Sequence, residues 1–425
     1  MIPSFDARTI EHNYRHAQEA YAAFGVDTEA ALARLADIPL SLHCWQGDDV
    51  GGFEGTGGEL GGGLAATGNY PGKARTPEEL RRDLSKVYSL LPGRHRLNLH
   101  AIYADFDGKV VDRDAITPSL FEKWIAWAKE EGIGLDFNPT FFSHPRASDG
   151  WTLASADKGT RDFWVQHGIA CREIAGAMGK ALGNCCICNL WIPDGEKDLP
   201  ADRWSPRERL QESLDRIFAQ AMDPAHMKDS VEPKLFGIGS EAYVVGSFDF
   251  YLAHAVQRGK ILCLDTGHFH PTEQIADKLS AVLLYLDEVL LHVSRGLRWD
   301  SDHVVILGDE VRALAEEIVR GEVVHRVHIG LDFFDASINR IAAWVIGARA
   351  MQKALLLALL QPTKMLKELE AAGDRTARLA LMEECKSMPF SAVWDYFCET
   401  NGVPAGAAWL DEVRKYEREV LAERG

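Results

Sequence analysis

Short apolar runs alternate along the first three quarters of the chain with longer segments in which apolar residues repeat at helical spacing. Nearly continuous apolar runs are typical of parallel strands that are buried on both faces. We predict eight such strands, at 38–45, 96–103, 134–142, 185–192, 230–238, 260–265, 288–294 and 326–333. Eight strand–helix units indicate an α/β protein with a (β/α)8 TIM barrel, although a doubly wound open sheet has the same alternation.

Helix signals support this repeat and extend past it. Thr76-Pro77 and Ser205-Pro206 each place a hydroxyl cap before a proline at the first helical position. After residue 333 the strand patterns stop and helical patterns continue. We therefore predict an N-terminal helical segment (1–37), a barrel that carries the metal sites (38–335) and a C-terminal helical extension (336–425). The apolar run 354–360 is too short to span a bilayer and predicts a buried helix.

Charge and composition narrow the partners. The formal net charge of -17 would repel a phosphate backbone, so we expect no nucleic-acid partner. The first residues lack the basic and apolar regions of a secretory signal, which favours a cytoplasmic protein with no membrane partner. The eight cysteines are scattered and lack the paired spacing of a zinc site, so we expect reduced, buried thiols.

The segment Gly51–Gly68 is too rich in glycine to form regular structure. It lacks the strand and helix that flank a dinucleotide fingerprint, so we expect no nucleotide cofactor. Because it follows the first strand, it emerges at the catalytic face of a barrel. Two interpretations stay open, a lid that closes over a ligand and an ordinary surface loop.

Polar residues gather where the expected strands end, which is where barrel enzymes place their catalytic groups. They are His100, Asp136, Asn138, Asn189, Glu232, Lys234, Asp265, His268, His292 and Asp332. Asp300 and Asp302 lie at positions i and i+2, so an extended segment would turn both to one side. So many carboxylates would repel one another without cations between them. Oxygen ligands with an imidazole favour Mn²⁺, with Co²⁺ or Mg²⁺ as alternatives, over a structural zinc.

Longer motifs then point to a family. The chain carries HCWQGDDV at 43–50, RLNLHAIY at 96–103, LDFNP at 135–139, GHFHPTE at 267–273 and RWDSDHVV at 298–305. With similar matches over nearly the whole chain, these motifs resemble the L-rhamnose isomerase family. The resemblance implies a homotetramer that interconverts L-rhamnose and L-rhamnulose, the first step of L-rhamnose catabolism, with Mn²⁺ at two sites and no organic cofactor.

The same resemblance implies a role for each site residue. One ion is held by Glu232, Asp265, His292 and Asp332. The second ion lies beside the reacting carbons and is held by His268, Asp300 and Asp302, with Asp265 as a bridge. His100 and Lys234 contact substrate oxygens and count with Asp332 as catalytic, while Trp191 offers a face to the sugar. His270 has the same strand parity as His268, and only the family pattern prefers His268.

The chemistry fits these residues. Cations beside O1 and O2 of the opened sugar would stabilise charge while hydrogen moves between C1 and C2. A hydride shift and an enediol route both stay open, and Glu232-Pro233-Lys234, which resembles the xylose isomerase group, favours the hydride shift. Two other classes are alternatives: a metal-dependent phosphate-ester hydrolase, disfavoured by the acidic charge, and a non-catalytic sugar-binding protein. Related aldoses such as L-mannose remain candidate substrates.

Overall fold

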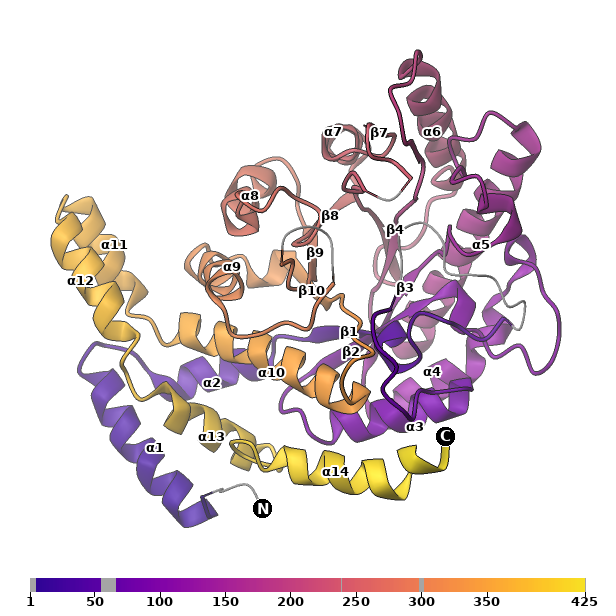
Figure 1. Cartoon of the computed structure of the whole chain (residues 1–425). Coiled ribbons are helices and arrows are strands. Elements are labelled where there is room, and N and C mark those ends of the chain that lie inside the picture. Colours follow the sequence, from indigo (N-terminus) through magenta and orange to yellow (C-terminus); the bar gives the residue numbers. More distant parts are fainter. Residues whose placement is uncertain (1–4, 55–65, 238, 298–301, 425) are drawn as a thin grey trace.

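The structure, a computed structural model, describes residues 5–54, 66–237, 239–297 and 302–424 (Figure 1). Eight parallel strands close into a barrel in the order β1-β10-β9-β8-β6-β4-β3-β2. They are β1 (Leu40–His43), β2 (His95–His100), β3 (Gly134–Asn138), β4 (Cys186–Leu190), β6 (Met227–Val231), β8 (Ile261–Asp265), β9 (Val289–Val293) and β10 (Val327–Leu331). The expected barrel is confirmed, and closure excludes the open sheet.

The fifth barrel strand differs from its expected position. Strand β6 ends at Val231, although the apolar pattern predicted a strand that continues to 238. Pro233 lacks a backbone N–H and cannot extend the ladder, so Glu232 and Lys234 lie in the loop that follows. The chain returns nearby in a small antiparallel sheet of β5 (Gly195–Glu196) and β7 (Tyr243–Val244), which the sequence pattern did not predict.

Helices follow the strands around the outside of the barrel (Figure 1). They are α3 (Pro77–Tyr88), α4 (Glu122–Glu131), α5 (Lys158–Leu182), α6 (Trp204–Ile217), α7 (Phe248–Arg258), α8 (Ile275–Leu283), α9 (Asp309–Arg320) and α10 (Arg340–Leu359). Helix α3 begins as predicted, with the Thr76 hydroxyl accepting from the Glu79 N–H at 3.1 Å. The start of α6 was predicted wrongly, because the Asp202 carboxylate accepts from the N–H groups of Trp204 and Ser205 and caps the helix earlier.

Helix α10 contains the predicted buried apolar run. It is long and apolar enough to cross a membrane by length and composition, but 83% of its most apolar window is buried inside the protein. Its Trp344 indole donates to the backbone oxygen of His43 at 3.0 Å, which joins it to the end of β1. We therefore describe α10 as a core helix.

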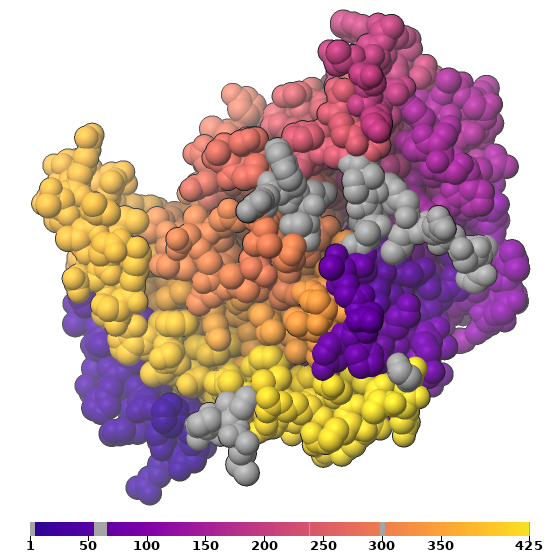
Figure 2. Space-filling model, in the orientation of Figure 1, coloured from indigo at the N-terminus to yellow at the C-terminus, as the bar shows by residue number. Residues whose placement is uncertain are grey.

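The remaining helices lie outside the barrel. They are α1 (Ala7–Ala22), α2 (Thr28–Ala36), α11 (Thr363–Ala371), α12 (Arg375–Cys385), α13 (Phe390–Thr400) and α14 (Trp409–Glu419). Helix α1 packs against α13, where the rings of Tyr14 and Tyr396 stack with centroids 3.8 Å apart. Figure 2 shows this indigo and yellow layer along one side of the molecule. Helices from the N-terminal and C-terminal parts of the chain thus pack against each other beside the barrel.

Candidate metal centre at the mouth of the barrel

Strand register brings the central residues of the site together. Asp265 at the end of β8 is paired with His292 on β9, and neighbours in register point to the same side of a sheet. Asp332 directly follows β10, and its N–H donates to the Val293 oxygen at 3.0 Å. Glu232 follows β6 in the same way, with its N–H donating to the Leu190 oxygen at 2.9 Å. Backbone pairing therefore fixes all four residues at one end of the barrel.

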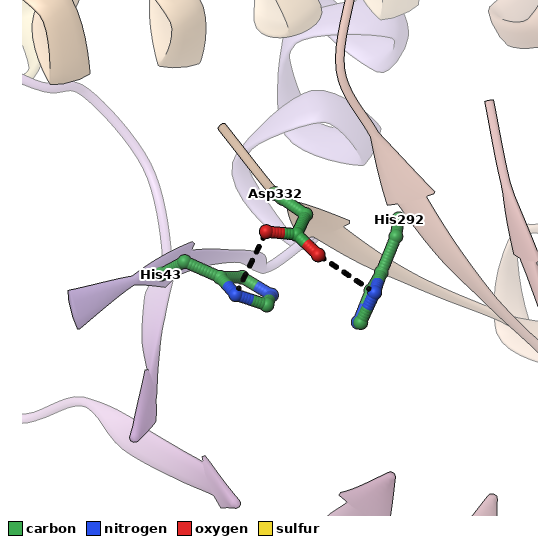
Figure 3. A group of neighbouring side chains, drawn as sticks. All are labelled: His43, His292 and Asp332. Atoms are coloured by element: carbon green, nitrogen blue, oxygen red, sulfur yellow. Dashed lines mark ion pairs between the residues drawn. The ribbon is translucent and has the colours of Figure 1, made fainter. Parts of the chain in front are cut away.

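The side chains of these residues converge. Nδ1 of His292 lies 3.1 Å from Oδ2 of Asp332, 3.2 Å from Oε2 of Glu232 and 3.9 Å from Oδ2 of Asp265. Figure 3 shows the His292–Asp332 pair. All four side chains are buried, and their candidate ligand atoms lie within 4.8 Å of one another. We call Glu232, Asp265, His292 and Asp332 the four-residue group.

The contacts within this group have the character of a ligand set. Neither ring nitrogen of His292 has a hydrogen-bond partner among the described residues, and the same is true of Oδ1 of Asp332. Buried polar atoms are normally satisfied, so atoms that approach one another without hydrogen-bond geometry indicate a missing common partner. Three carboxylates and one imidazole suit a divalent cation such as Mn²⁺. The residues present fit a metal ion.

Electrostatics favours a positive charge at this point. Burial opposes ionisation of Glu232, but His292, His268 and the Asn189 amide outweigh it and lower the pKa of Glu232 to about 2. Burial also opposes protonation of His292, yet Cys263, Glu232 and Asp332 raise its pKa well above its ordinary value. The carboxylates thus stabilise positive charge, which a bound cation would supply.

His43 is a member of the site that reasoning from the sequence missed. Its Nδ1 lies 3.2 Å from Oδ1 of Asp332, so Asp332 lies between the imidazoles of His43 and His292 (Figure 3). Together the three residues form an alternative ligand set. His43 is the last residue of β1, so the strand-end rule that was used on the other strands would have found it.

The expected second metal site is described only in part. Nδ1 of His268 lies 3.3 Å from Oε1 of Glu232, and the His268 side chain is only 8% exposed. His270 is exposed, and its Nδ1 lies 2.8 Å from the Thr272 hydroxyl. Asp300 lies outside the described residues. Asp302 has a φ of 38°, so the extended backbone expected at this residue is wrong.

The three expected substrate contacts lie near aromatic side chains. The His100 ring stacks on Trp45 with centroids 4.3 Å apart, and Phe142 lies 6.3 Å from His100 and 6.1 Å from Trp191. Nζ of Lys234 lies 6.0 Å from the centroid of the Trp191 ring. Phe142 and Trp45 were not singled out from the sequence, because buried aromatic residues in the core have the same pattern.

A cavity of about 650 Å³ opens beside Lys234 and His268. Its lining includes Lys234, Phe236, Phe248, His268 and Phe269. A monosaccharide fits within a volume of this order, and polar groups beside aromatic faces are typical of sugar-sized sites. The cavity therefore joins the Lys234 side of the mouth to the His268 side.

The fold and this site define a class of protein, a TIM-barrel enzyme with a candidate metal centre at the carboxyl ends of its strands. Residues 8–424 match the family model for L-rhamnose isomerase (RhaA). The chain is 60% identical over 418 residues to the L-rhamnose isomerase of Rhodopirellula baltica, covering 98% of each chain. It is 59% identical over 416 residues to that of Mannheimia succiniciproducens, covering 98% of this chain and 99% of the relative. The chain belongs to the L-rhamnose isomerase family.

A solved structure of an L-ribulose 3-epimerase also resembles this chain. The sequence identity is 14% and the TM-score 0.48, over 78% of this chain and 97% of the epimerase.

Proposed function

We propose that this chain interconverts L-rhamnose and L-rhamnulose by moving hydrogen between C1 and C2 of the open-chain sugar. Membership of the L-rhamnose isomerase family supports isomerase activity on a sugar substrate. The observation that supports a metal-dependent mechanism is the convergence of buried donor atoms from Glu232, Asp265, His292 and Asp332. The proposal places the reaction directly above this group.

In this proposal the four-residue group would hold one Mn²⁺, and His268, Asp300 and Asp302 would hold a second, with Asp265 contributing to both sites. Bound cations supply positive charge that polarises O1 and O2 of the sugar. Co²⁺ and Mg²⁺ have similar oxygen preferences and are the alternatives. No organic cofactor takes part.

The other residues orient the sugar. Burial lowers the pKa of His100 to about 3, so its imidazole is neutral and contributes hydrogen bonds rather than charge. Its Nδ1 is buried without a hydrogen-bond partner among the described residues, which leaves it for a substrate hydroxyl. Lys234 donates an N–H to the Pro193 oxygen at 3.0 Å, which fixes its ammonium group near Trp191. Trp191 then covers the apolar face of the sugar.

We propose that hydrogen moves as a hydride, because the Glu-Pro-Lys at 232–234 is similar to that of the xylose isomerase group. We count Asp332 among the catalytic residues. Isotope transfer separates this route from the enediol route. Substrate deuterated at C2 should give ketose that keeps the label at C1 if hydride moves directly. An enediol intermediate would exchange the label with solvent.

The assembly and cellular context are part of the same proposal. We propose a homotetramer in the cytoplasm that catalyses the first step of L-rhamnose catabolism. We also propose that residues 1–37 and 336–425 add helices to the catalytic barrel, and within 336–425 helix α10 is the one that follows the last barrel strand. Light scattering on the purified protein tests the tetramer, and a dimer or monomer would contradict it.

The central test combines metal and substrate. Protein stripped by a chelator is assayed for ketose formation on 6-deoxyhexoses and aldohexoses, including L-rhamnose and L-mannose, before and after Mn²⁺ is returned. We expect activity on L-rhamnose to disappear and then recover. Full activity in metal-free protein would refute the mechanism, and rapid hydrolysis of an aryl phosphate with Mn²⁺ would favour the hydrolase alternative.

A further inference from the structure

The barrel is hollow on the side opposite to the four-residue group. A cavity of about 1140 Å³ enters from the amino ends of the strands. Its mouth lies between the α1–α2 turn and the α10–α11 turn, and its lining includes Ser41, Asn98, Asn189, Leu290 and Gly330. Eight-stranded barrels are normally filled by side chains at this level. We call this space the lower chamber.

Two small residues explain the space. Ser41 on β1 and Gly330 on β10 are paired in register and leave one side of the interior almost without side-chain volume. Gly330 also lies beside His292 of the four-residue group, since a Cβ built on Gly330 would lie 3.2 Å from the Cδ2 of His292. The missing side chain therefore opens the chamber and leaves room for the His292 ring.

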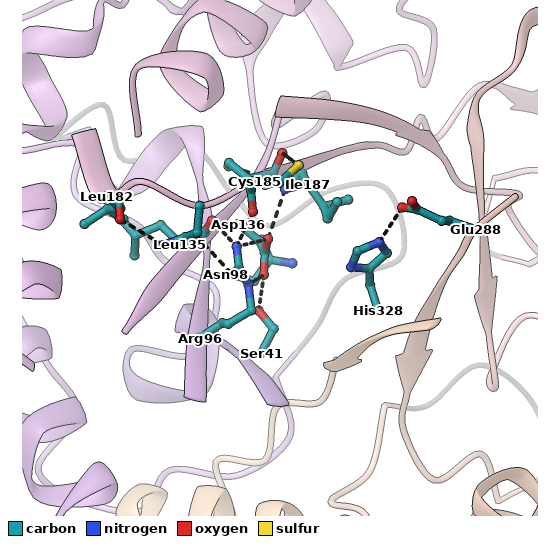
Figure 4. A network of polar contacts seen from close by, with 12 residues as sticks. Ser41, Arg96, Asn98, Leu135, Asp136, Leu182, Cys185, Ile187, Glu288 and His328 are labelled. Carbon is teal, nitrogen blue, oxygen red and sulfur yellow. Dashed lines mark hydrogen bonds and ion pairs between the residues drawn. The ribbon is translucent and has the colours of Figure 1, made fainter. Parts of the chain in front are cut away.

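The charged groups in the inner wall of the chamber, within the barrel, are already neutralised. The Asp136 carboxylate accepts from Arg96, from the Ser41 hydroxyl and from the Ile187 N–H (Figure 4). Farther round the same interior, Glu288 pairs with His328 at 2.8 Å. Because these charges are compensated, the wall favours a neutral ligand over an ion.

Two asparagines separate the chamber from the metal centre. Asn189 donates its Nδ2 hydrogen to Oε2 of Glu232 at 2.5 Å, and Nδ2 of Asn98 lies 2.8 Å from Nε2 of His43. A carboxylate only accepts, so Glu232 fixes the Asn189 amide with its nitrogen toward the metal centre. Nδ2 of Asn98 can only donate, so Nε2 of His43 is its acceptor and fixes the Asn98 amide in the same sense.

The oxygen of each amide, opposite to the nitrogen that contacts the metal centre, needs a hydrogen-bond partner of its own. Oδ1 of Asn98 and Oδ1 of Asn189 are buried and have no hydrogen-bond partner among the described residues, and both residues line the lower chamber. Asn98 is 3% exposed and Asn189 is 2% exposed. A buried carbonyl oxygen beside a polar cavity is normally satisfied by ordered water.

We propose that the lower chamber holds ordered water bound to Oδ1 of Asn98 and Asn189, and that these two asparagines are positioning residues for the metal centre. Water that donates to each oxygen fixes the amide, and the amide N–H then holds His43 or Glu232 in place. Water that enters at the far end of the barrel thus orients His43 and Glu232 at the metal centre through the two amides. This inference rests on the proposed metal-dependent function.

The first test examines the chamber directly. A crystal structure at about 1.0 Å resolution, at which the amide oxygen and nitrogen can be told apart, should show a water oxygen within hydrogen-bond distance of each Oδ1. A dry chamber, or an amide whose oxygen faces His43 or Glu232, would overturn the proposal. This measurement does not depend on the activity of any variant.

The second test measures Mn²⁺ affinity by calorimetry on chelator-treated protein. Asn189→Leu and Asn98→Leu keep the branched shape and the number of non-hydrogen side-chain atoms but remove the amide, and each should weaken Mn²⁺ binding by at least about 10-fold. Asn98→Ser and Asn189→Ser serve if the leucine variants do not fold. Ser41→Ala lines the same chamber without touching the metal centre, and it should bind Mn²⁺ within about 2-fold of wild type.

The outcomes distinguish this inference from the function on which it rests. If wild-type protein binds no Mn²⁺ and needs none, the proposed function fails. If wild-type protein needs Mn²⁺ and the asparagine variants bind it equally well, only the positioning role fails. Selective loss of affinity in the asparagine variants, with Ser41→Ala unchanged, supports the proposal.

Discussion

Nδ1 of His292 lies 3.1 Å from Oδ2 of Asp332, and both side chains are buried at the carboxyl end of the barrel. These two atoms, from neighbouring strands of the barrel, thus lie close together without forming a hydrogen bond. A cation would bind both at once, which makes the pair the most direct test of the metal centre.

The first prediction concerns Asp332→Asn. The variant keeps the shape of the side chain but loses the charge that binds a cation, so Mn²⁺ should raise its Tm much less than it raises that of wild type. L-Rhamnose isomerisation should fall by at least about 100-fold. Asp309→Asn, which changes a fully exposed carboxylate at the start of α9, is the matched control and should behave as wild type. Equal Mn²⁺-induced Tm shifts in Asp332→Asn and wild type would remove Asp332 from the ligand set.

The second prediction compares two histidines of one motif. His268→Gln should reduce turnover by at least about 10-fold, because Nδ1 of His268 lies 3.3 Å from the Glu232 carboxylate. His270→Gln should stay within about 3-fold of wild type, because His270 is exposed and bonded to Thr272. Steady-state kinetics with saturating Mn²⁺ measures both. A larger loss in the His270 variant would reverse the assignment.

His268 and His270 also show where the alternation of a strand no longer predicts the direction of a side chain. Strand parity placed His268 and His270 on the same side, but β8 ends at Asp265 and the His268 N–H donates to the Asp265 oxygen at 3.2 Å. The chain turns there, so parity no longer applies. Glu232 is similar, since it lies after β6 rather than within it. Strand cores are predictable because both faces are buried, whereas the loops that aim the ligands depend on tertiary packing.

Closure of the barrel and the neighbours of each ligand depend on long-range contacts. The pairing of Asp265 with His292 is a matter of register between strands, which the alternation of strands and helices does not determine. The support of Glu232 by Asn189 joins residues that are 43 positions apart. Composition predicted a glycine-rich loop that is either a lid or an ordinary surface loop, but residues 55–65 lie outside the described part of the chain.

The third prediction is a pH dependence of stability at Asp48. Burial raises the pKa of Asp48 to about 7, although the Tyr103 hydroxyl and the Gly52 N–H oppose the shift. Between the unfolded value of 3.8 and about 7 the folded protein holds a proton that the unfolded chain has released. The contribution of Asp48 to stability is therefore complete at low pH and is lost as the pH rises through this window.

Asp48→Asn tests this directly, because the amide keeps a donor for Tyr103 and an acceptor for the Gly52 N–H. The Tm of Asp48→Asn relative to wild type should increase between about pH 5 and about pH 8. Scanning calorimetry at fixed protein concentration measures the difference. A Tm difference that does not change with pH would mean that Asp48 is ionised throughout this range.

The last prediction concerns Gly68, the last residue of the glycine-rich segment, which packs against the backbone of Ala336 and Ser337. Gly68 has a φ of 112°, and a Cβ built on it would lie 2.4 Å from the backbone carbon of Ala336 and 2.4 Å from the backbone nitrogen of Ser337. Backbone atoms cannot move aside as a flexible side chain does. Gly68→Ala should therefore destabilise the protein by about 3 kcal/mol, from both steric clash and backbone strain.

Gly25→Ala provides the matched control. Gly25 has a φ of 72°, but a Cβ added to it would meet no atom within 4 Å, so only the conformational cost of about 1 kcal/mol remains. Thermal unfolding of the two variants at equal concentration separates the clash from the strain. Gly68→Ala should have the lower Tm of the two, because only its added Cβ meets backbone atoms of the packed chain. If Gly68→Ala melts no lower than Gly25→Ala, the close packing of Gly68 on Ala336 does not stabilise the folded chain.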